Sequence, residues 1–325
     1  MTNSSSAQKD SLTTEYDVAI VGGGAAGLSA ATVLARSLRK VVVIDAGQPR
    51  NAPAAGAHNV LGQDGISPLE LLARGRAEAT GYGAEIRSDT VVDAAGTVDD
   101  FTLRLSSGEI VAARRLILAT GLVDELPDLP GVAELWGHDV LHCPYCHGYE
   151  VRGTRIVQIA TSPMSAHQAL MFRQLSDRVT VVAHDPDALS DDDRSHFAAV
   201  GIDIVDARVE RVRTRAENGS AHLDGVLLTD GTVVEADAVV VSPRFIVRGD
   251  LYERLGGTLD DGPMGGLVGT GPMGETALPG VWAVGNTTTV HAMVTVAMGE
   301  GVSAGAAVNA SLVMADLDAK VSALA

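Results

Sequence analysis

The only two cysteines of the chain are Cys143 and Cys146, and a histidine flanks the pair on each side. A Cys-x-x-Cys motif is either a redox-active dithiol or half of a four-ligand metal site. The sequence holds no second cysteine pair, and His142 and His147 lie too close to the motif to complete a tetrahedral zinc shell. The motif therefore predicts thiol–disulfide exchange, and we expect no metal site.

The composition argues against several other kinds of function. The 325 residues carry a formal net charge of −17, and such a surface repels nucleic-acid backbones and anionic lipid. No apolar run approaches the length of a membrane span, and the polar residues 1–15 lack the apolar core of a signal peptide. We expect a disordered N-terminal tail and a cytoplasmic protein with no nucleic-acid or membrane partner, a setting in which structural disulfides are rare.

A glycine-rich turn near the N-terminus has the spacing of a dinucleotide-binding motif. An apolar strand at residues 17–21 precedes it and a helical stretch at residues 28–38 follows; a second strand then ends in Asp45. The glycines of the motif are Gly22, Gly24 and Gly27. The first makes a tight turn, the second lets backbone approach a pyrophosphate, and the third lets the helix pack on the strand. The helix N-terminus would bind the phosphates, and Asp45 would bind the adenosine ribose.

The same order of elements recurs later in the chain, which indicates two nucleotide-fold units in tandem. The second unit has strands at residues 155–159 and 179–182 around a helix at residues 166–175. In register, the glycines are replaced by Ala160, Ser162 and Ser165, and the aspartate by Ala183. We therefore expect this unit to bind NADPH poorly or not at all. The alternative is that alanine and serine are small enough to be tolerated.

Together with the segment CPYCHGYE at residues 143–150, these features resemble the low-molecular-weight thioredoxin-reductase family. The closest resemblance is to its dithiol-oxidase branch, the gliotoxin- and holomycin-type enzymes. Supporting motifs lie at residues 45–51, 116–121, 135–137, 167–170 and 280–286. The chain departs from the family at Asn286, where thioredoxin reductases usually carry aspartate, and at Ala160 and Ser162, where even the closer relatives often keep glycine.

The resemblance implies an α/β fold with two Rossmann-like units of the three-layer ββα type, and FAD as cofactor. Residues 16–122 and 245–325 would form the FAD-binding domain, and residues 123–244 a degenerate NAD(P)-binding-like domain that carries the cysteines. The implied FAD-binding residues are Gly22, Gly24, Ala25, Ala26, Asp45, Ala46, Gln48, Arg50, Asn51, Ala119, Thr120, Gly121, Gly285, Asn286, Ala292 and Met293. The family is typically homodimeric, so we expect a homodimer.

The resemblance also implies how electrons pass. Cys146 would face the flavin and Cys143 would exchange with the substrate, after which molecular oxygen regenerates the flavin and hydrogen peroxide forms. Each thiol step needs a proton acceptor near neutral pH, and the imidazole of His147 titrates in that range. We expect His147 to be the general base, the alternative being a histidine that only packs or caps a helix start. His142 is expected to be structural.

The leading expectation is an FAD-dependent oxidase that closes an intramolecular disulfide in a small-molecule dithiol without NADPH. The alternative is a disulfide reductase acting on thioredoxin or a similar protein, with NADPH or a protein such as ferredoxin as electron donor. A non-enzymatic flavoprotein that senses redox state or serves as a scaffold is a third possibility. A scaffold would need neither the two cysteines nor the histidine beside them.

Overall fold

A computed structural model describes residues 16–217, 219–262 and 265–324, so the N-terminal tail expected at residues 1–15 lies outside the described residues. The chain divides into two compact units. Within the described residues, unit 1 contains residues 16–49, 72–122 and 247–324, and unit 2 contains Arg50–Leu71 and Val123–Ile246. Each unit has its own hydrophobic core, and each is described by itself below.

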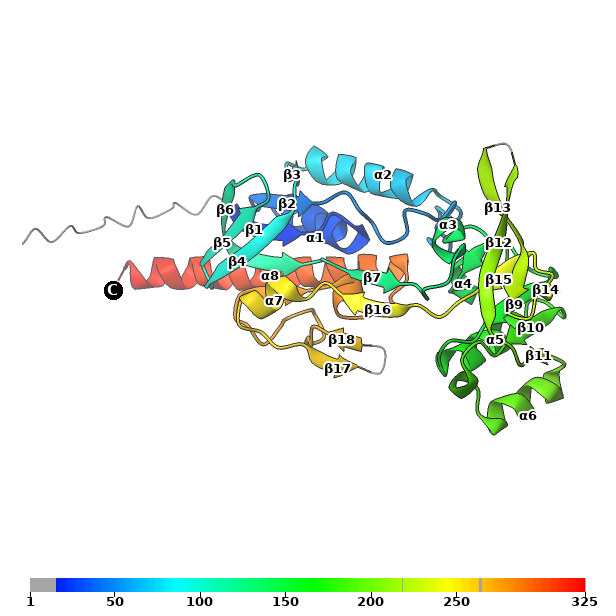
Figure 1. Ribbon diagram of the computed structural model, residues 1–325. Helices are drawn as coiled ribbons and strands as arrows, with labels where there is room; N and C mark the ends of the chain where they lie inside the picture. The colour runs from blue at the N-terminus through cyan, green and yellow to red at the C-terminus, as the bar shows by residue number, and fades with distance from the viewer. Residues whose placement is uncertain (1–15, 218, 263–264, 325) are drawn as a thin grey trace, which may run out of the picture. The chain divides into compact units, whose positions relative to one another are not determined.

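Unit 1 is built on a seven-stranded sheet whose order is β3-β2-β1-β6-β5-β4, with β19 paired to β6 (Figure 1). Its strands are β1 (Tyr16–Val21), β2 (Val41–Asp45), β3 (Glu85–Ser88), β4 (Val91–Thr97), β5 (Asp100–Leu105), β6 (Ile110–Leu118) and β19 (Val281–Ala283). A separate antiparallel pair is formed by β17 (Asp260–Gly262) and β18 (Gly265–Leu267). The helices of unit 1 are α1 (Ala25–Arg36), α7 (Asp250–Arg254), α8 (Val294–Ser322), the 3-10 helix η2 (Gly285–Thr287) and, from Leu72 onward, α2 (Pro68–Gly81). The pairs β1–β2, β1–β6, β2–β3 and β6–β19 are parallel, as expected for a nucleotide fold.

Helix α8 runs alongside α1, and small residues allow the two helices to approach closely (Figure 1). A Cβ atom added to Gly301 would collide with the backbone carbonyl of Ala26, and one added to Gly305 would lie 3.1 Å from the carbonyl oxygen of Ala30. Leu34 and Leu312 are fully buried in the same core, and burying a side chain of this size stabilises a fold by about 1.5–3 kcal/mol. The helix pair therefore fixes the start of α1, where the glycine motif lies.

By length and composition α8 could cross a membrane, since its most apolar stretch has a mean hydropathy of 1.2. Of that stretch, 39% is buried within the protein. From the sequence we expected no apolar run of this length. The expectation missed α8 because its apolar residues are interspersed with Gly, Ser, Thr and Asn. The core helix of a globular unit has the same properties. The packing of Ala304 and Val308 against α1, both with no exposed surface, accounts for the apolar face of α8.

Arginines join α8 to β6 and to the segment that follows α1. Arg115 is 3% exposed, and its guanidinium donates to Asp99 at 2.7 Å and to the Ser311 hydroxyl at 3.1 Å. Further along α8, Asp316 accepts from Arg39 at 2.8 Å. A buried cation is tolerated when its donors are satisfied in this way.

Unit 2 contains a five-stranded parallel sheet in the order β11-β10-β9-β15-β8 and a three-stranded antiparallel sheet, β12-β13-β14. Its strands are β8 (Val140–Leu141), β9 (Ile156–Ile159), β10 (Val179–Val182), β11 (Asp203–Val205), β12 (Val209–Glu217), β13 (Ser220–Leu228), β14 (Val233–Val234) and β15 (Ala238–Val240). Its helices are α3 (Val132–Leu135), α4 (Pro144–His147), α5 (Met164–Arg173), α6 (Asp191–Val200) and the 3-10 helix η1 (Pro186–Ala188). The two connecting strands β7 (Leu122–Glu125) and β16 (Arg244–Val247) pair with each other. The α/β class expected from the sequence is confirmed.

Residues 50–71, which we expected in the FAD-binding domain, belong to unit 2 instead. The guanidinium of Arg50 makes two hydrogen bonds to Asp124, at 2.8 and 2.6 Å. The side-chain amide of Asn59 donates to the backbone carbonyl of Tyr145 at 3.0 Å. Both contacts lie within unit 2, although the segment falls between two elements of unit 1 in the sequence.

Candidate functional site

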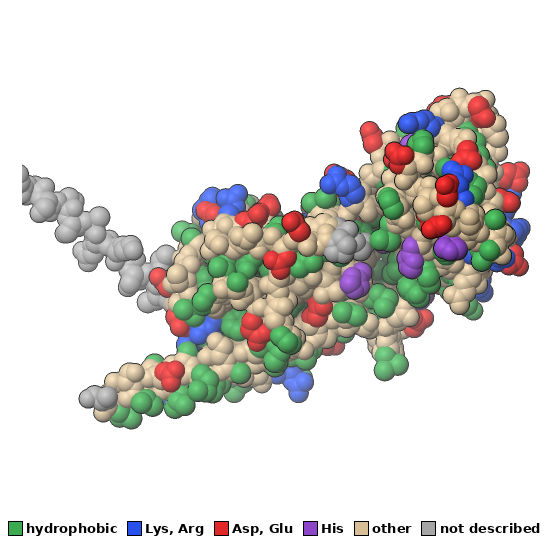
Figure 2. Space-filling model, turned by 90° about the horizontal axis from the view of Figure 1, so that it is seen from below, with side chains coloured by type: hydrophobic (Ala, Val, Ile, Leu, Met, Phe, Trp, Pro, Cys, Tyr) green, Lys and Arg blue, Asp and Glu red, His purple; other side chains and the backbone are tan. Residues whose placement is uncertain are grey.

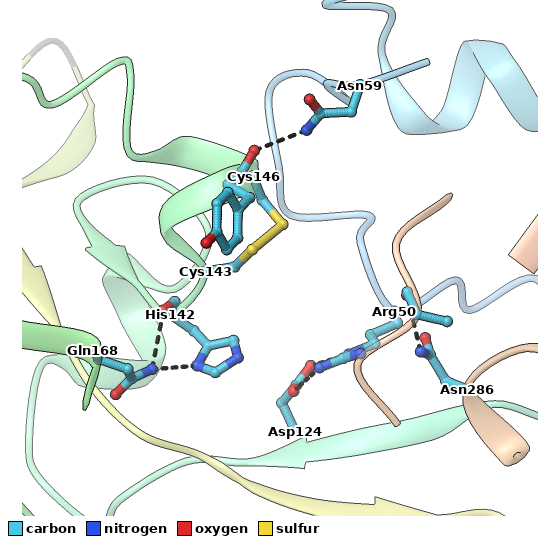
Figure 3. The surroundings of a disulfide bond; sticks show 10 residues. Arg50, Asn59, Asp124, His142, Cys143, Cys146, Gln168 and Asn286 are labelled. Atoms are coloured by element: carbon cyan, nitrogen blue, oxygen red, sulfur yellow. Dashed lines mark hydrogen bonds and ion pairs between the residues drawn. A yellow bond between two sulfur atoms is a disulfide. The ribbon is translucent and has the colours of Figure 1, made fainter. Parts of the chain in front are cut away.

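The two cysteines form a disulfide at the start of the short helix α4, with their Cα atoms 5.3 Å apart (Figure 3). Cys143 is the N-cap residue, and Pro144 occupies the first helical position, where its missing N–H costs nothing. Both cysteines are half-buried, and Tyr145 between them is 64% exposed. This arrangement confines the disulfide to one turn that solvent reaches, as thiol–disulfide exchange requires. We call residues 143–148 the redox turn.

His147 follows Cys146 directly and carries a buried, unsatisfied nitrogen. Within the described residues, its Nε2 atom has no hydrogen-bond partner. Burial lowers the pKa of His147 below the usual value of 6.5, and the charge of Glu150 opposes this shift. The imidazole is therefore neutral near pH 7, the protonation state that a general base needs.

His142, on the other side of the redox turn, is held in one orientation. The Gln168 amide donates to Nδ1 of His142 at 2.7 Å and to its backbone carbonyl at 3.0 Å (Figure 3). This assignment places the proton on Nε2. Burial lowers the pKa of His142 to about 4, so the ring stays neutral at physiological pH. Its edge-on contact with Phe245, at 5.3 Å between ring centroids, fits the structural role expected from the sequence.

Two residues expected to bind FAD, Arg50 and Asn51, fall in unit 2. Besides its bonds to Asp124, the Arg50 guanidinium lies over the ring of Phe245, 4.9 Å from the centroid. The carbonyl of Asn51 accepts the N–H of Ala54 at 3.1 Å in a local turn. The other implied FAD-binding residues lie in unit 1.

The glycine turn of unit 1 has the geometry that its sequence predicts. Gly22 has a φ of +108°, and a Cβ atom there would collide with the carbonyl oxygen of Ala119. A Cβ atom on Gly27 would collide with the carbonyl oxygen of Gly22, whereas one on Gly24 would meet no protein atom within 4 Å. Gly24 caps α1 without a side-chain hydrogen bond. The space beside Gly24 and the first N–H groups of α1, from Ala25 and Ala26 onward, fit a pyrophosphate.

Asp45 ends β2 next to this turn. An added Cβ atom on Gly23 would lie 2.7 Å from the Asp45 carboxylate, which places the acid beside the glycines. The carboxylate accepts the N–H of Gly47 at 3.2 Å and forms an ion pair with Arg76, a partner that sequence reasoning missed. Ala46 and Gln48 follow in an exposed loop. The carboxylate is suitably placed to bind a ribose hydroxyl.

The C-terminal motif folds into a hydrogen-bonded turn around η2. The Asn286 amide donates to the carbonyl oxygens of Thr289, Val290 and Ala292 at 3.0, 3.2 and 3.1 Å. The usual family aspartate could not donate these bonds when ionised, so the departure at Asn286 has a structural role in this chain. The backbone N–H of Gly285 donates to Glu300 at 2.7 Å, which ties the turn to α8.

Fully buried Thr287 joins this turn to the end of β6. Its hydroxyl accepts the N–H of Gly121 at 2.7 Å and lies 3.1 Å from the Thr120 hydroxyl. A Cβ atom on Gly285 would lie 3.1 Å from the Cβ of Ala26. Unit 1 thus brings the expected groups at Ala26, Gly121 and Gly285 together, while Met293 is exposed at the N-cap of α8. Sequence reasoning missed Thr287 and Glu300; the only signal for Thr287 was its place directly after Asn286.

The corresponding turn of unit 2 is satisfied by its own side chains. Ser165 is fully buried where the third glycine would lie, and its hydroxyl accepts the N–H of Thr161 at 3.3 Å. The same hydroxyl lies 3.0 Å from that of Ser242, which donates to Gln168. Ala183 stands where the ribose-binding acid would be. This turn has neither the glycines of the first turn nor an acid at the position that corresponds to Asp45.

Among the described residues, no group of three His, Cys, Asp or Glu side chains could hold a metal ion. A family model for pyridine nucleotide-disulphide oxidoreductases matches residues 16–301, most of the chain. The chain belongs to this family. It is therefore an oxidoreductase of the pyridine nucleotide-disulphide type.

Relatives of this oxidoreductase confirm the resemblance drawn from the sequence. Thioredoxin reductase tcpT of Claviceps purpurea is 34% identical, over 83% of this chain and 86% of its own length. Thioredoxin reductase sirT of Leptosphaeria maculans is 30% identical, over 94% of this chain and 97% of its own length. The crystal structure of HlmI is 43% identical, with a TM-score of 0.88 over 95% of this chain and 96% of that one. These similarities confirm the thioredoxin-reductase-like fold of the oxidoreductase.

Proposed function

We propose that this oxidoreductase is an FAD-dependent dithiol oxidase that acts on a small molecule. One dithiol and one O₂ would give one cyclic disulfide and one hydrogen peroxide, so two electrons and two protons leave the substrate and reach oxygen. The observation that carries the proposal is a Cys143–Cys146 disulfide in a chain whose second nucleotide turn has lost its binding residues. In that turn the hydroxyl of Ser165 bonds to the backbone, and Ala183 replaces the acid. An enzyme that takes electrons from its thiol substrate needs no NADPH site.

The residues of unit 2 would carry the thiol chemistry. One substrate thiolate attacks Cys143 and displaces Cys146 as a thiolate; the second substrate thiol then attacks the mixed disulfide, closes the product ring and releases the Cys143 thiol. His147 takes up a proton from a substrate thiol, because its buried nitrogen is neutral near pH 7. The glycine turn, Asp45 and the Asn286 turn would bind FAD, which supplies a two-electron acceptor that oxygen can reoxidise.

The exposed aromatic rings near the disulfide support an apolar or aromatic substrate. Tyr145 and Tyr149 are 64% and 65% exposed, and both lie in the segment that carries the cysteines. The Arg152 guanidinium lies 3.9 Å from the centre of the Tyr149 ring and holds it in place. Exposed rings of this kind favour a compact ring-containing dithiol over a strongly charged one.

We further propose that the enzyme is a cytoplasmic homodimer. Apolar side chains gather along the C-terminal part of α8 (Figure 2). Val313, Met314 and Leu317 are each about half exposed there. A second copy of the same helix would bury these side chains.

A disulfide reductase is the second candidate, because the matched family and the names of the relatives include pyridine nucleotides and thioredoxin reductases. Anaerobic bleaching of the flavin separates the two functions. We expect a small dithiol to bleach the purified holoenzyme and air to restore its colour with one equivalent of peroxide, whereas NADPH leaves the flavin oxidised. Rapid bleaching by NADPH would overturn the oxidase proposal and establish the reductase.

Replacing His147 by glutamine is expected to lower kcat/KM for a dithiol by about 100-fold, the usual contribution of a general base. Since burial lowers the pKa of His147, the base is neutral above that pKa and is protonated as the pH falls through it. The wild-type pH profile should therefore lose activity as the pH falls through this lowered pKa, and the variant should lack this limb. An acid limb that persists unchanged in the variant would remove His147 from this role.

A further inference from the structure

A loop in the segment between β2 and α2 contacts the redox turn. We call residues 57–66 the clasp loop. Its ends pair through Ala57 and Ile66, where the N–H of Ala57 donates to the Ile66 carbonyl at 2.7 Å. The N–H of Gly65 returns a bond to the Ala57 carbonyl at 3.0 Å. Val60 in the middle of the loop is 5% exposed, so this part of the clasp loop is packed rather than extended into solvent.

Asn59 adopts an unusual backbone conformation inside the clasp loop. Its φ is +61°, in the left-handed region that asparagine tolerates better than other residues with a side chain. Asp64 supports this conformation, since one of its carboxylate oxygens accepts the N–H of Asn59 at 3.0 Å. The other carboxylate oxygen lies 3.3 Å from Nδ1 of His58. The conformation directs the Asn59 amide at the redox turn (Figure 3).

The amide reaches a carbonyl that α4 itself leaves without a donor. The Cys143 carbonyl accepts the N–H groups of Cys146 and His147, each at 3.2 Å, and the Pro144 carbonyl accepts that of Gly148 at 3.0 Å. Because the helix ends there, no backbone N–H in the described part of the chain donates to the Tyr145 carbonyl. The Asn59 amide fills this place at 3.0 Å.

A second contact joins the same two segments. Nε2 of His58 lies 3.4 Å from the Glu150 carboxylate, three residues beyond α4. The clasp loop therefore contacts the redox turn at Tyr145 and its continuation at Glu150. The contact at Tyr145 lies between the two cysteines in the sequence.

We propose that Asn59 is a positioning residue for the redox turn and that its amide keeps the two sulfur atoms close enough to favour the disulfide. The inference rests on the proposed function only in taking Cys143 and Cys146 as the redox pair. Without this hydrogen bond the turn samples more conformations, the effective concentration of one thiol at the other falls, and the disulfide becomes easier to reduce. A single hydrogen bond is worth about 1 kcal/mol, or roughly fivefold in an equilibrium constant.

The test is the anaerobic equilibrium of the holoenzyme with a glutathione buffer, read by alkylating and counting free thiols. Two glutathione thiols are oxidised to one glutathione disulfide as Cys143–Cys146 is reduced to two thiols. We expect N59D and N59G each to shift this equilibrium toward the dithiol by about three- to tenfold, tenfold being about 30 mV. Glycine keeps the left-handed backbone and aspartate keeps the side-chain shape, but neither donates to the carbonyl.

Leu61 provides the matched control, because it lies in the same loop and its side chain is fully exposed. L61A should leave the equilibrium unchanged. If N59G matches the wild type, Asn59 serves only the loop backbone and the proposal is wrong; N59D should then also have no effect. The glutathione equilibrium of the disulfide is measured without a dithiol substrate. A lack of activity on dithiols would therefore refute the oxidase function, and the glutathione equilibrium would still test the role of Asn59.

Discussion

Replacing Cys143 by serine is expected to reduce dithiol-dependent peroxide formation by at least about 1000-fold, and C146S should do the same. Each variant lacks the disulfide that accepts the substrate electrons in the proposed function, and a lone thiol is already reduced and cannot accept an electron pair. Losses of this size are typical when one member of a catalytic unit is removed. Peroxide formation with a small dithiol under air measures the effect directly.

The two variants should still differ in one respect. C146S keeps the exchange thiol and should form a mixed disulfide with an activated aromatic disulfide reagent, which releases its other half as a thiolate. The product is seen as one adduct by mass spectrometry. C143S should react more slowly, because Cys146 is the thiol expected to face the flavin. Preferential adduct formation on Cys146 would reverse the assigned roles while leaving the pair as the redox group. Turnover within tenfold of the wild type in either variant would contradict the redox role itself.

Gly24→Ala is expected to weaken retention of FAD by about 10- to 100-fold without changing the stability of the protein freed of cofactor. A Cβ atom on Gly24 meets no protein atom within 4 Å, so the added methyl group would obstruct the phosphate expected to bind there and not the protein itself. Overpacking by one carbon costs about 1–3 kcal/mol. The ratio of flavin to protein absorbance after dialysis measures the retention.

Gly22→Ala is the matched comparison within the same motif. Because Gly22 has a φ of +108° and a Cβ atom there would collide with Ala119, this substitution lowers the stability of the folded protein itself. We expect a loss of about 2–4 kcal/mol in the free energy of unfolding, with or without flavin. Equal stability losses in the two cofactor-free variants would show that the open side of Gly24 does not face the cofactor.

Local patterns predicted the elements that fix the nucleotide turn. The expected helix at residues 28–38 is α1, Ala25–Arg36, and the strand expected at residues 179–182 is β10. Gly22, which the sequence predicts to make the tight turn, has a φ of +108°. These features depend on spacing and on backbone restrictions carried by neighbouring residues, so a single sequence contains them.

Long-range polar partners could not be predicted in the same way. Arg76 lies 31 residues from Asp45 and Thr287 lies 166 residues from Gly121. No periodicity links such pairs, since each depends on how elements pack in three dimensions. Asn59 escaped notice for the same reason: its role appears only when its amide meets the Tyr145 carbonyl.

The chain passes between the two units at residues 49–50, 71–72, 122–123 and 246–247. Unit 2, which carries the cysteines, is therefore formed by two separate segments of the chain, and recombination at a single segment could not exchange it as a whole. A transplant of residues 123–246 alone would leave Asp124 without Arg50 and the Tyr145 carbonyl without Asn59. Variation between homologous enzymes in these two stretches should be correlated, and a productive chimera must inherit both from the same parent.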